Sequence, residues 1–378
     1  MKVTSWTVTL LIFAARAIFL EDMLSGKRDP GPTRVDQTAR RKSSHVDIVL
    51  NQNVDYLKST GFEKYEFIHN ALPEIDFDKI DTSVGLFSHR FSAPIIVSSM
   101  TGGFKRAGKI NAALAEFCSE KSIGMGVGSQ RQALSNEDYI DTFKVVRRVA
   151  KDIFVMGNIG AAQVVSGFAL ENARRIVDMV EADALAVHLN VLQELIQPEG
   201  DRNFRGVVAG ISRLVKAIKI PVIVKETGAG IGADAARKLI DAGVSAIDVS
   251  GAGGTSWAAI EMLRREEGGR RVGRKFWNWG IPTAEALVRV NAIPTRKKIK
   301  LISSGGIRDG IDVAKSIALG ADLCAAAQPF LKALEEDGVN GLVREFDAWM
   351  EELRGVMFLT GSRDLRQLRK AKLEKVAA

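Results

Sequence analysis

The sequence predicts a (β/α)₈ barrel, a fold in which eight parallel strands alternate with helices. Short apolar runs recur at fairly even intervals after residue 90, and amphipathic stretches separate them. Each run is apolar on both faces and ends in Gly, Ser, Asn, Glu or Ala, which is typical of buried parallel strands. The runs begin at Ala93, Ile123, Ile153, Ala184, Pro221, Ala246, Lys300 and Asp322.

The stretches between the runs predict helices. Residues 111–121 and 233–242 carry apolar side chains at helical spacing, and Gly243 follows the second stretch as a helix-ending glycine. A doubly wound sheet stays an alternative, because only the order of the strands in space separates it from a barrel. The widest gap between strands contains a polar, glycine-rich segment at 264–280. We interpret that segment as a lid over the active site.

Three parts are predicted along the chain: an extension at residues 1–35, an N-terminal cap at 36–90 and the barrel at 91–370. Residues 3–20 are apolar, but they are short for a membrane span and include Arg16. Membrane contact by residues 3–20 is therefore the less favoured alternative, and Met23 is a second candidate for the start of translation. The polar stretch at 25–44 is typical of a linker.

Composition narrows the function classes. Hydrophobic residues make up 46% of the chain and charged residues 26%, as in ordinary globular proteins. The formal net charge of +8 suits anionic ligands, whereas an aromatic content of 7% and the lack of a zinc-finger spacing argue against nucleic acid. Cys118 and Cys324 lie in apolar contexts without a Cys/His cluster. We therefore expect buried thiols in a cytoplasmic protein rather than disulfides or structural zinc.

Polar, glycine-rich residues follow the predicted strands, and in a barrel these strand ends share the mouth where active sites lie. Gly305 and Gly306 would leave backbone N–H groups open to a phosphate, and a helix beginning near Asp309 would add its dipole. The segment 248–257 is a second glycine-rich strand exit that could complete the phosphate site. A plain glycine turn is the alternative for both segments.

Cations lie at several of the same strand ends. Lys225 could stabilise an anionic reduced flavin, form a Schiff base, or simply pair with Glu226. Residues 40–42 form a basic run, and on a helix His45 would share a face with Arg41. Together with the cationic segment 128–132 they predict a ligand with two or more negative charges, although a solvated linker could also carry such a run.

Gln193 and Glu194 stand side by side in a predicted loop after the strand that begins at Ala184. One carboxylate together with ligand phosphates is the usual way in which Mg²⁺ is held, so Glu194 is a candidate metal ligand. His188, near the end of the same strand, is either a catalytic residue or a core histidine.

These motifs resemble those of a known family, the type 2 isopentenyl diphosphate isomerases, which are FMN-dependent (β/α)₈ barrels. The resemblance covers residues 37–360 in order and leaves the start of the chain unexplained. It rests on RKSSH, SSMTGG, GVGSQR, GNIGA, HLNVLQELIQPEGDRNF, VKETGAGI, DVSGAGGTSW, WGIPTAEAL and SSGGIRDGIDVAKSIALGADLCAAAQPFL.

The resemblance implies the interconversion of isopentenyl and dimethylallyl diphosphate in isoprenoid biosynthesis. It implies reduced FMN as acid and base, Mg²⁺ on the diphosphate, NADPH as reductant, and a homo-oligomer such as a tetramer or octamer. The implied catalytic residues are Gln193, Lys225 and His188, and the implied Mg²⁺ ligand is Glu194. The implied substrate-binding residues are Arg41, Lys42, His45, Ser129, Gln130, Arg131 and Gln193. The implied FMN-binding residues are Ser99, Met100, Thr101, Ser129, Asn158, Lys225, Ser250, Thr255, Gly306, Ile307, Arg308, Ala327 and Gln328.

Two other functions stay open at this point. An FMN-dependent 2-hydroxy-acid oxidase or dehydrogenase would share the phosphate loops but needs a histidine base beside the flavin, for which His188 is the only candidate at a strand end. A phosphate-binding barrel without catalysis is the second alternative.

Overall fold

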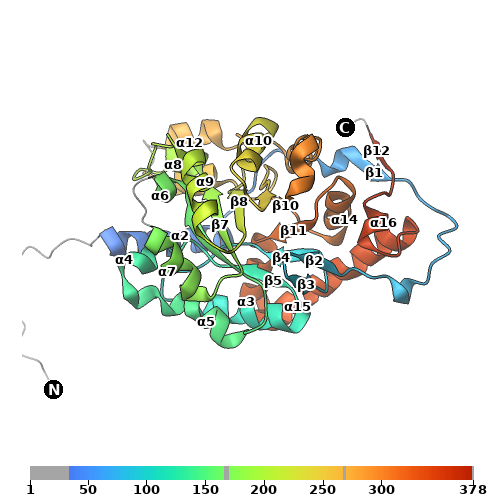
Figure 1. The fold of residues 1–378 in the computed structure, drawn as a ribbon, viewed down its shortest axis with the longest axis horizontal. Helices are drawn as coiled ribbons and strands as arrows, with labels where there is room; N and C mark the ends of the chain where they lie inside the picture. The colour runs from blue at the N-terminus through green and yellow to red at the C-terminus, as the bar shows by residue number, and fades with distance from the viewer. Residues whose placement is uncertain (1–33, 166–169, 267–269, 377–378) are drawn as a thin grey trace, which may run out of the picture. The chain divides into compact units, whose positions relative to one another are not determined.

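The computed structural model describes residues 34–165, 170–266 and 270–376. Its contacts separate Met1–Thr38 from Ala39–Ala378, and the second unit contains a closed barrel of parallel strands (Figure 1). The strands follow the order β10-β11-β4-β5-β6-β7-β8-β9 around the barrel. The predicted (β/α)₈ barrel is therefore confirmed, and the closed order excludes the doubly wound sheet.

Every predicted apolar run contains a barrel strand. The strands are β4 (Ile95–Val97), β5 (Gly124–Gly126), β6 (Val155–Gly160), β7 (Ala184–Leu189), β8 (Val222–Glu226), β9 (Ala246–Asp248), β10 (Lys300–Ser304) and β11 (Leu323–Ala326). All but the ends of β7 and β10 are buried, because helices cover the outside and side chains fill the inside.

Helices connect successive strands and pack against the outside of the barrel. They are α3 (Ala107–Lys121), α4 (Arg131–Ser135), α5 (Asp141–Val149), α6 (Ala161–Val165), α7 (Leu170–Val180), α8 (Val191–Ile196), α9 (Val207–Ala217), α10 (Ala233–Asp241), α11 (Trp257–Leu263), α12 (Arg270–Phe276), α13 (Thr283–Asn291), α14 (Gly310–Ala318), α15 (Gln328–Leu359) and α16 (Leu365–Leu368). Helix α10 ends as expected, since Gly243 adopts a φ of 88° and its N–H bonds Ile240 O.

The amino ends of the strands are closed by a hairpin from the predicted cap, formed by β2 (Val84–Leu86) and β3 (His89–Phe91). Leu86 and Phe91 are buried in one cluster with the inward-facing residues of the barrel, among them Phe154 and Ile223. The hairpin therefore plugs this end of the barrel and leaves the carboxyl ends as its mouth.

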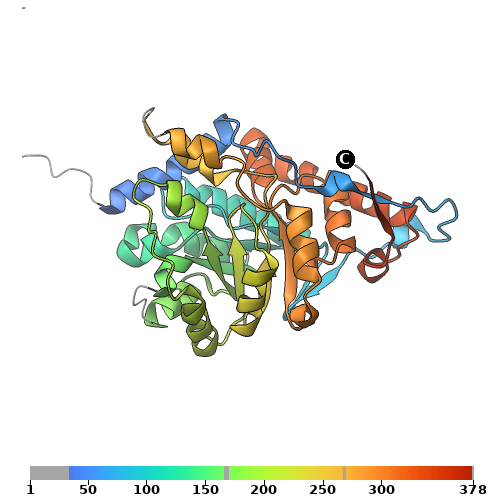
Figure 2. The same ribbon diagram turned by 90° about the horizontal axis from the view of Figure 1, so that it is seen from above.

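The cap also contains helix α2 (Arg34–Asn51) and the short elements η1 (Phe62–Lys64), β1 (Tyr65–Phe67) and η2 (Phe77–Lys79). Strand β1 pairs antiparallel with β12 (Leu373–Lys375) near the other end of the chain. The linker predicted at 25–44 was wrong for its second half, because residues 34–44 are helical and Val46 and Val49 anchor the helix in the core. Figure 2 shows α2 beyond the carboxyl ends of the strands.

Helices α11, α12 and α13 and the turn η5 (Pro294–Lys298) fill the gap between β9 and β10. Within it, Gly273 lies so close to Met262 that a Cβ there would meet the Met262 side chain. The predicted lid at 264–280 stays a prediction, and its residues 267–269 lie outside the described part of the chain.

In the described ranges no helix is long and apolar enough to cross a membrane. Residues 3–20 lie outside those ranges, so the question of their membrane contact is not tested. The division into extension, cap and barrel likewise stays a prediction.

Candidate active site at the barrel mouth

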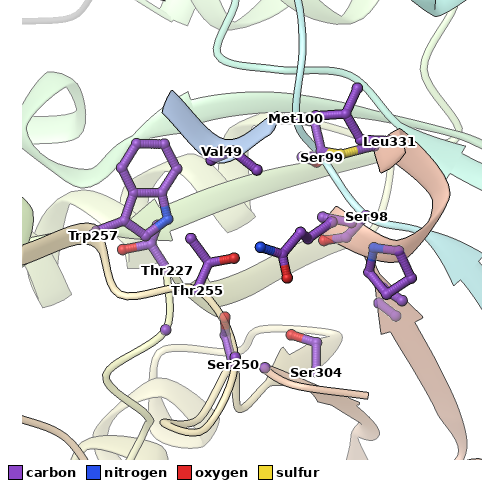
Figure 3. A pocket seen from close by; sticks show the side chains of 18 of the residues that line it. Val49, Ser98, Ser99, Met100, Thr227, Ser250, Thr255, Trp257, Ser304 and Leu331 are labelled. Atoms are coloured by element: carbon purple, nitrogen blue, oxygen red, sulfur yellow. The ribbon is translucent and has the colours of Figure 1, made fainter. Parts of the chain in front are cut away.

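The carboxyl ends of the strands open into a cavity of 1140 Å³, a volume that includes space open to solvent. Segments that follow β4, β8, β9, β10 and β11 line it, and α2 supplies Lys42 and His45 from the cap. Figure 3 shows Ser250, Thr255 and Trp257 of the β9 exit, Ser304 of β10 and Ser98 after β4 around the same space. Side chains far apart in sequence thus converge at the mouth.

Most of the predicted FMN-binding residues line this cavity. They are Ser99, Met100, Lys225, Ser250, Thr255, Gly306, Ile307, Arg308, Ala327 and Gln328. The hydroxyl of Ser99 is buried and lacks a hydrogen-bond partner among the described residues. A buried hydroxyl is seldom left unpaired, so Ser99 fits a ligand that brings polar atoms into the cavity.

The glycines in these loops are needed for close packing, and not only to leave backbone N–H groups open as expected. A Cβ on Gly305 would lie 2.1 Å from Gly251 O, and one on Gly306 would lie 2.5 Å from Thr60 Cγ2. Both residues also have positive φ, at 98° and 80°. The glycines are therefore required by the packing of the β9 exit, the β10 exit and the cap on one another, which in turn shapes the phosphate-sized hollow.

Helices α14 and α15 both begin near this hollow, and they differ in what their first N–H groups contact. Helix α14 begins beside Asp309 as expected, but carboxylates already accept its first N–H groups: Asp309 bonds Asp312 N, and Glu352 bonds Gly310 N. Helix α15 begins at Gln328 on the cavity wall with no side-chain cap and with Pro329 in its first turn. Its amino end is therefore the one available to an anion.

Lys225 reaches the cavity from the end of β8 and is 6% exposed. Its Nζ donates to the carbonyl oxygen of Glu226 at 2.7 Å, while the Glu226 carboxylate accepts the N–H groups of Thr227 and Ala229. Burial raises the pKa of Glu226 to about 7 against those hydrogen bonds. Among the described residues Lys225 thus contacts the carbonyl and not the carboxylate of Glu226, which disfavours the ion-pair alternative.

Asp248 is the register partner of Lys225 on β9 and is 2% exposed. Burial raises the pKa of Asp248, although Lys225 and a 2.6 Å hydrogen bond from the Ser304 hydroxyl lower it. Asp248 is thus the buried carboxylate whose charge acts on Lys225 from beneath the cavity.

Several predicted residues lie behind the cavity wall. The Thr101 hydroxyl donates to Asn111 Oδ1 at 2.5 Å, and Asn158 holds Val127 O and His188. Gln130 was predicted to bind substrate, but it is fully buried. Its amide bonds Ile176 O and Asn158 N, so it joins β6 to α7 instead.

His188 does not line the cavity. Its Nδ1 lies 2.8 Å from Asn158 Oδ1, and burial, together with Lys225 and Lys42, lowers the pKa of His188 to about 3. A buried imidazole hydrogen-bonded to Asn158 agrees with the core-histidine alternative.

The basic side chains of α2 contact three different parts of the site, one each for Arg41, Lys42 and His45. Arg41 pairs with Glu199 at 3.3 Å, outside the cavity wall. Lys42 lines the cavity and donates to Gly102 O at 2.9 Å and Ser129 O at 2.6 Å, on the loops after β4 and β5. Burial and the neighbouring Arg41 lower the pKa of Lys42 to about 7. The carbonyl oxygen of Ser129 is therefore occupied by Lys42. Arg131 begins α4, and its side chain is exposed.

His45 faces the cavity and contacts Trp257 edge to face at a centroid distance of 5.1 Å. Its Nε2 lies 2.9 Å from Glu261 Oε1, and burial, against the pull of Glu261, lowers the pKa of His45. The contact is short, but Nε2 forms no hydrogen bond of good geometry with the described residues.

Gln193 and Glu194 lie on the short helix α8, not in a loop as predicted. Gln193 is buried and donates to Glu261 Oε1 at 2.9 Å. Glu194 Oε1 accepts from Asn190 Nδ2 at 2.8 Å, and Oε2 accepts from Asp201 N at 2.7 Å. The two neighbours therefore hold different partners, and the Glu194 carboxylate is fixed in place.

Glu261 on α11 is the residue that sequence reasoning missed. It is fully buried and joins His45, Gln193 and Arg264. Although burial raises its pKa, the contacts with His45, Arg264 and Gln193 lower the pKa of Glu261 to about 2. An ionised Glu261 thus connects the cap, α8 and the β9 exit. Only its position after the SGAGGTSW strand exit could have marked it.

Known proteins resemble the chain along nearly its whole length. Residues 149–375 match the FMN-dependent dehydrogenase family. The isopentenyl-diphosphate delta-isomerase of Stutzerimonas stutzeri is 47% identical over 341 residues, which are 89% of this chain and 97% of the relative. The isomerase of the same name from Methanosarcina mazei is 44% identical over 88% of this chain and 91% of its own length.

This chain belongs to the isopentenyl-diphosphate delta-isomerase family. The predicted family and the prediction of an isomerase are both confirmed. The match to the FMN-dependent dehydrogenase family places the β6 to β12 region, with Lys225 and the phosphate loops, on a flavoprotein scaffold.

Solved structures share the fold at much lower identity. A mandelate oxidase variant with an FMN adduct has a TM-score of 0.62 at 20% identity, over 90% of this chain and 99% of that one. A second mandelate oxidase complex has a TM-score of 0.63 at 19% identity, over 91% and 98%. This likeness concerns the barrel alone, whereas the isomerase family is set by the close relatives.

Proposed function

We propose that the protein interconverts isopentenyl diphosphate and dimethylallyl diphosphate, with FMN in the mouth cavity and Mg²⁺ on the diphosphate. The observation that carries the proposal is that two cationic sites share one cavity. Lys225, Arg308 and the α15 amino end lie on the barrel side, and Lys42 comes from the cap side. One site suits a flavin and its phosphate, and the other suits a diphosphate.

The barrel side fits FMN by its donor set. Ser99 offers an unpaired buried hydroxyl among the described residues, and Lys225 is a cation that lines the same cavity from the end of β8. Gly306, Ile307 and Arg308, with the α15 amino end, would hold the phosphate. When bound, reduced FMN supplies acid–base chemistry and a negative charge that Lys225 stabilises.

The cap side would bind the substrate. Lys42 is tied to two strand-end loops, and His45 is held by Glu261, so both are positioned before a ligand arrives. Arg41, Ser129 and Arg131 lie around the same helix and strand ends. Holding the diphosphate there fixes the reacting end by binding energy from the remote end. Trp257 and Met100 line the cavity with apolar surface that excludes water from the double bond.

Glu194 fits a Mg²⁺ ion that is shared with the diphosphate. Both of its carboxylate oxygens are fixed by a donor, and each keeps a further lone pair. Among the described residues no group of three or more His, Cys, Asp or Glu side chains could hold a metal. A single carboxylate plus ligand phosphates is therefore the form of site that these residues support.

The remaining parts of the proposal concern the setting of the reaction. NADPH would serve as the reductant of FMN, and the protein would work in the cytoplasm as a homo-oligomer. The isoprenoid substrates themselves are supported by the names of the relatives, which match this chain over most of its length.

The alternative, a 2-hydroxy-acid oxidase, is disfavoured by one residue. That chemistry needs a histidine base beside the flavin, and His188 lies behind the cavity wall with its Nδ1 bonded to Asn158. The barrel shared with mandelate oxidase does not supply the missing base.

The deciding experiment is deuterium exchange into isopentenyl diphosphate in D₂O, followed by NMR, with FMN, Mg²⁺ and dithionite present. We expect deuterium incorporation and formation of dimethylallyl diphosphate that stop when the flavin is oxidised. A flavin-loaded protein that leaves the substrate unchanged and oxidises 2-hydroxy acids would refute the proposal.

Glu194→Gln tests the metal assignment. We expect it to lose at least 100-fold in Mg²⁺-dependent kcat/KM, about the loss expected when a phosphate-bound ion is released, and to keep its FMN absorbance. Asp201→Asn removes a carboxylate from the same loop and serves as the control, which we expect to stay near wild type. Loss of FMN in the Glu194 variant would show that Glu194 supports the flavin and not the metal.

A further inference from the structure

An anion of the protein, the carboxylate of Asp55, already accepts hydrogen bonds from two of the side chains expected to bind the FMN phosphate. Arg308 Nη2 donates to Asp55 Oδ2 at 3.0 Å, and Gln328 Nε2 donates to Asp55 Oδ1 at 3.1 Å. Both donors line the cavity. The segment between α2 and η1 thus places one carboxylate on two of the side chains that a phosphate would use.

The backbone of Asp55 is held by its neighbours. Asp55 forms an isolated antiparallel bridge with Thr255, and its carbonyl accepts the indole N–H of Trp277 at 2.8 Å. On either side, Ser256 N donates to Val54 O and Tyr56 N donates to Gly254 O, both at 2.8 Å. Because the main chain is fixed to the β9 exit, only the Asp55 side chain can turn away from Arg308.

We propose that Asp55 is an internal competitor for the phosphate group of the flavin, holding Arg308 and Gln328 until the phosphate displaces it. A dianionic phosphate beside Gly306 and Arg308 would repel the carboxylate and would compete for the same two donors. The affinity for FMN is therefore set below what the cationic hollow alone would give. A flavin without a phosphate does not meet this competition.

The expected size of the effect follows from exposure. The side chains of Asp55 and Arg308 are 30% and 48% exposed, so solvent screens their interaction. Removing the competing charge should then tighten FMN binding by about two- to fivefold, the range that partly exposed ion pairs span.

The test compares two flavins on the full chain after bound flavin has been removed. Asp55→Asn keeps the shape of the side chain and removes its charge. We expect this variant to bind FMN two- to fivefold more tightly than wild type, and to bind riboflavin with unchanged affinity, as measured by quenching of flavin fluorescence. Asp55→Glu keeps the charge and should not gain affinity for FMN.

Glu285→Gln is the matched control for net charge, because Glu285 forms an exposed ion pair with Arg289 away from the cavity. Weaker FMN binding by Asp55→Asn would overturn the proposal by showing that Asp55 orients Arg308 for the phosphate. An equal change for riboflavin would overturn it by showing that the residue acts through packing of the cap.

The inference rests on the proposed function only in placing FMN in this cavity. The titrations contain no isoprenoid substrate, so a failure of isomerase activity would leave their result intact. If neither flavin binds, the FMN site itself is wrong, and the proposed function fails together with the inference.

Discussion

The two ends of the barrel treat charge in opposite ways. At the amino end, Asp183 lies just before β7, and its Oδ2 accepts from Val155 N and from Arg147, each at 2.8 Å. His89 of the plugging hairpin lies 3.5 Å from its other oxygen. One partly exposed carboxylate thus joins a strand, a helix and the cap.

The same arrangement recurs across the barrel. Asp322 lies just before β11, and its Oδ2 accepts from Leu301 N at 2.8 Å and from Arg296 at 2.9 Å. Arg369 contacts its other oxygen at 3.4 Å. An Ala-Asp pair precedes both strands, at 182–183 and 321–322. This repetition indicates that the charged residues at the amino end stabilise the fold.

The mouth differs. Lys42 is partly buried among carbonyl oxygens and has a lowered pKa, and among the described residues the Ser99 hydroxyl has no hydrogen-bond partner and Lys225 has no carboxylate within salt-bridge distance. Arg308 does pair with a carboxylate, that of Asp55. Under the proposed function the cations of the mouth bind phosphate groups, whereas the charges at the amino end hold the fold together. Removing a charge should accordingly affect stability at one end and function at the other.

The largest effect is expected at the amino end. Asp322→Ala would leave Arg296 and Arg369 without their shared carboxylate and Leu301 N without its acceptor. We expect a loss of about 3–5 kcal/mol in the free energy of unfolding, as for other broken buried pairs, with kcat/KM of the folded fraction unchanged. Urea denaturation measures the loss.

Asp234→Asn is the control for this prediction, since Asp234 also pairs with an arginine but its side chain is 93% exposed. It should unfold like wild type. An Asp322→Ala protein that loses little stability but has a low kcat/KM would contradict the division between the two ends.

The second effect belongs to the mouth. Glu261→Gln removes the charge that holds His45 and Gln193, while the similar shape of glutamine preserves the packing. We expect kcat to fall roughly 100-fold, the loss typical of misplaced reacting groups, and KM for the diphosphate to rise because His45 lies on the substrate side, while the FMN absorbance changes little. Steady-state kinetics on the FMN-loaded protein tests this, with Glu285→Gln as control. If KM rises while kcat is unchanged, Glu261 supports only substrate binding.

The smallest effect is a pH dependence at Lys42. Its pKa of about 7 in the free protein means that raising the pH from 7 to 8 removes most of its charge, whereas a bound diphosphate keeps the proton on. Substrate affinity should therefore weaken about fivefold over that range. Lys42→Arg stays charged and should lose this part of the pH dependence, as KM profiles of both proteins would show.

The same shift affects stability with the opposite sign. The unfolded chain binds more protons than the native one between the lowered pKa and the ordinary lysine pKa of 10.5. The destabilising contribution of Lys42 therefore shrinks as the pH rises through that window. A Lys42→Met variant should accordingly be more stable than wild type at pH 7 and approach it at high pH.

The sequence predicts where the strands lie along the chain better than it predicts where the side chains at their ends point. Eight apolar runs were enough to locate the strands, because burial on both faces is written locally in Val, Ile, Leu and Ala. Placing a residue at a strand end does not say which way its side chain points, however. Thr101 and Gln130 follow strands yet turn into the wall, while Ser99 and Lys225 turn into the cavity.

The role of Glu261 could not be predicted from the sequence for a related reason. A glutamate in a short helix looks like a solvated side chain, and its meaning comes from His45 and Gln193, which other segments bring to it. The choice between α14 and α15 as the anion-facing helix likewise depended on Glu352, a distant residue that bonds Gly310 N. Such partners are set by the tertiary fold and leave no local pattern.

The pairing of β1 with β12 has a consequence for the order of folding. Strand β1 precedes the barrel strands in the sequence, and its partner, Leu373–Lys375, follows them. A chain that grows from its amino end therefore completes the barrel strands before β1 can pair. Because such distant pairing comes late in folding, the barrel can form while the cap still lacks one of its attachments.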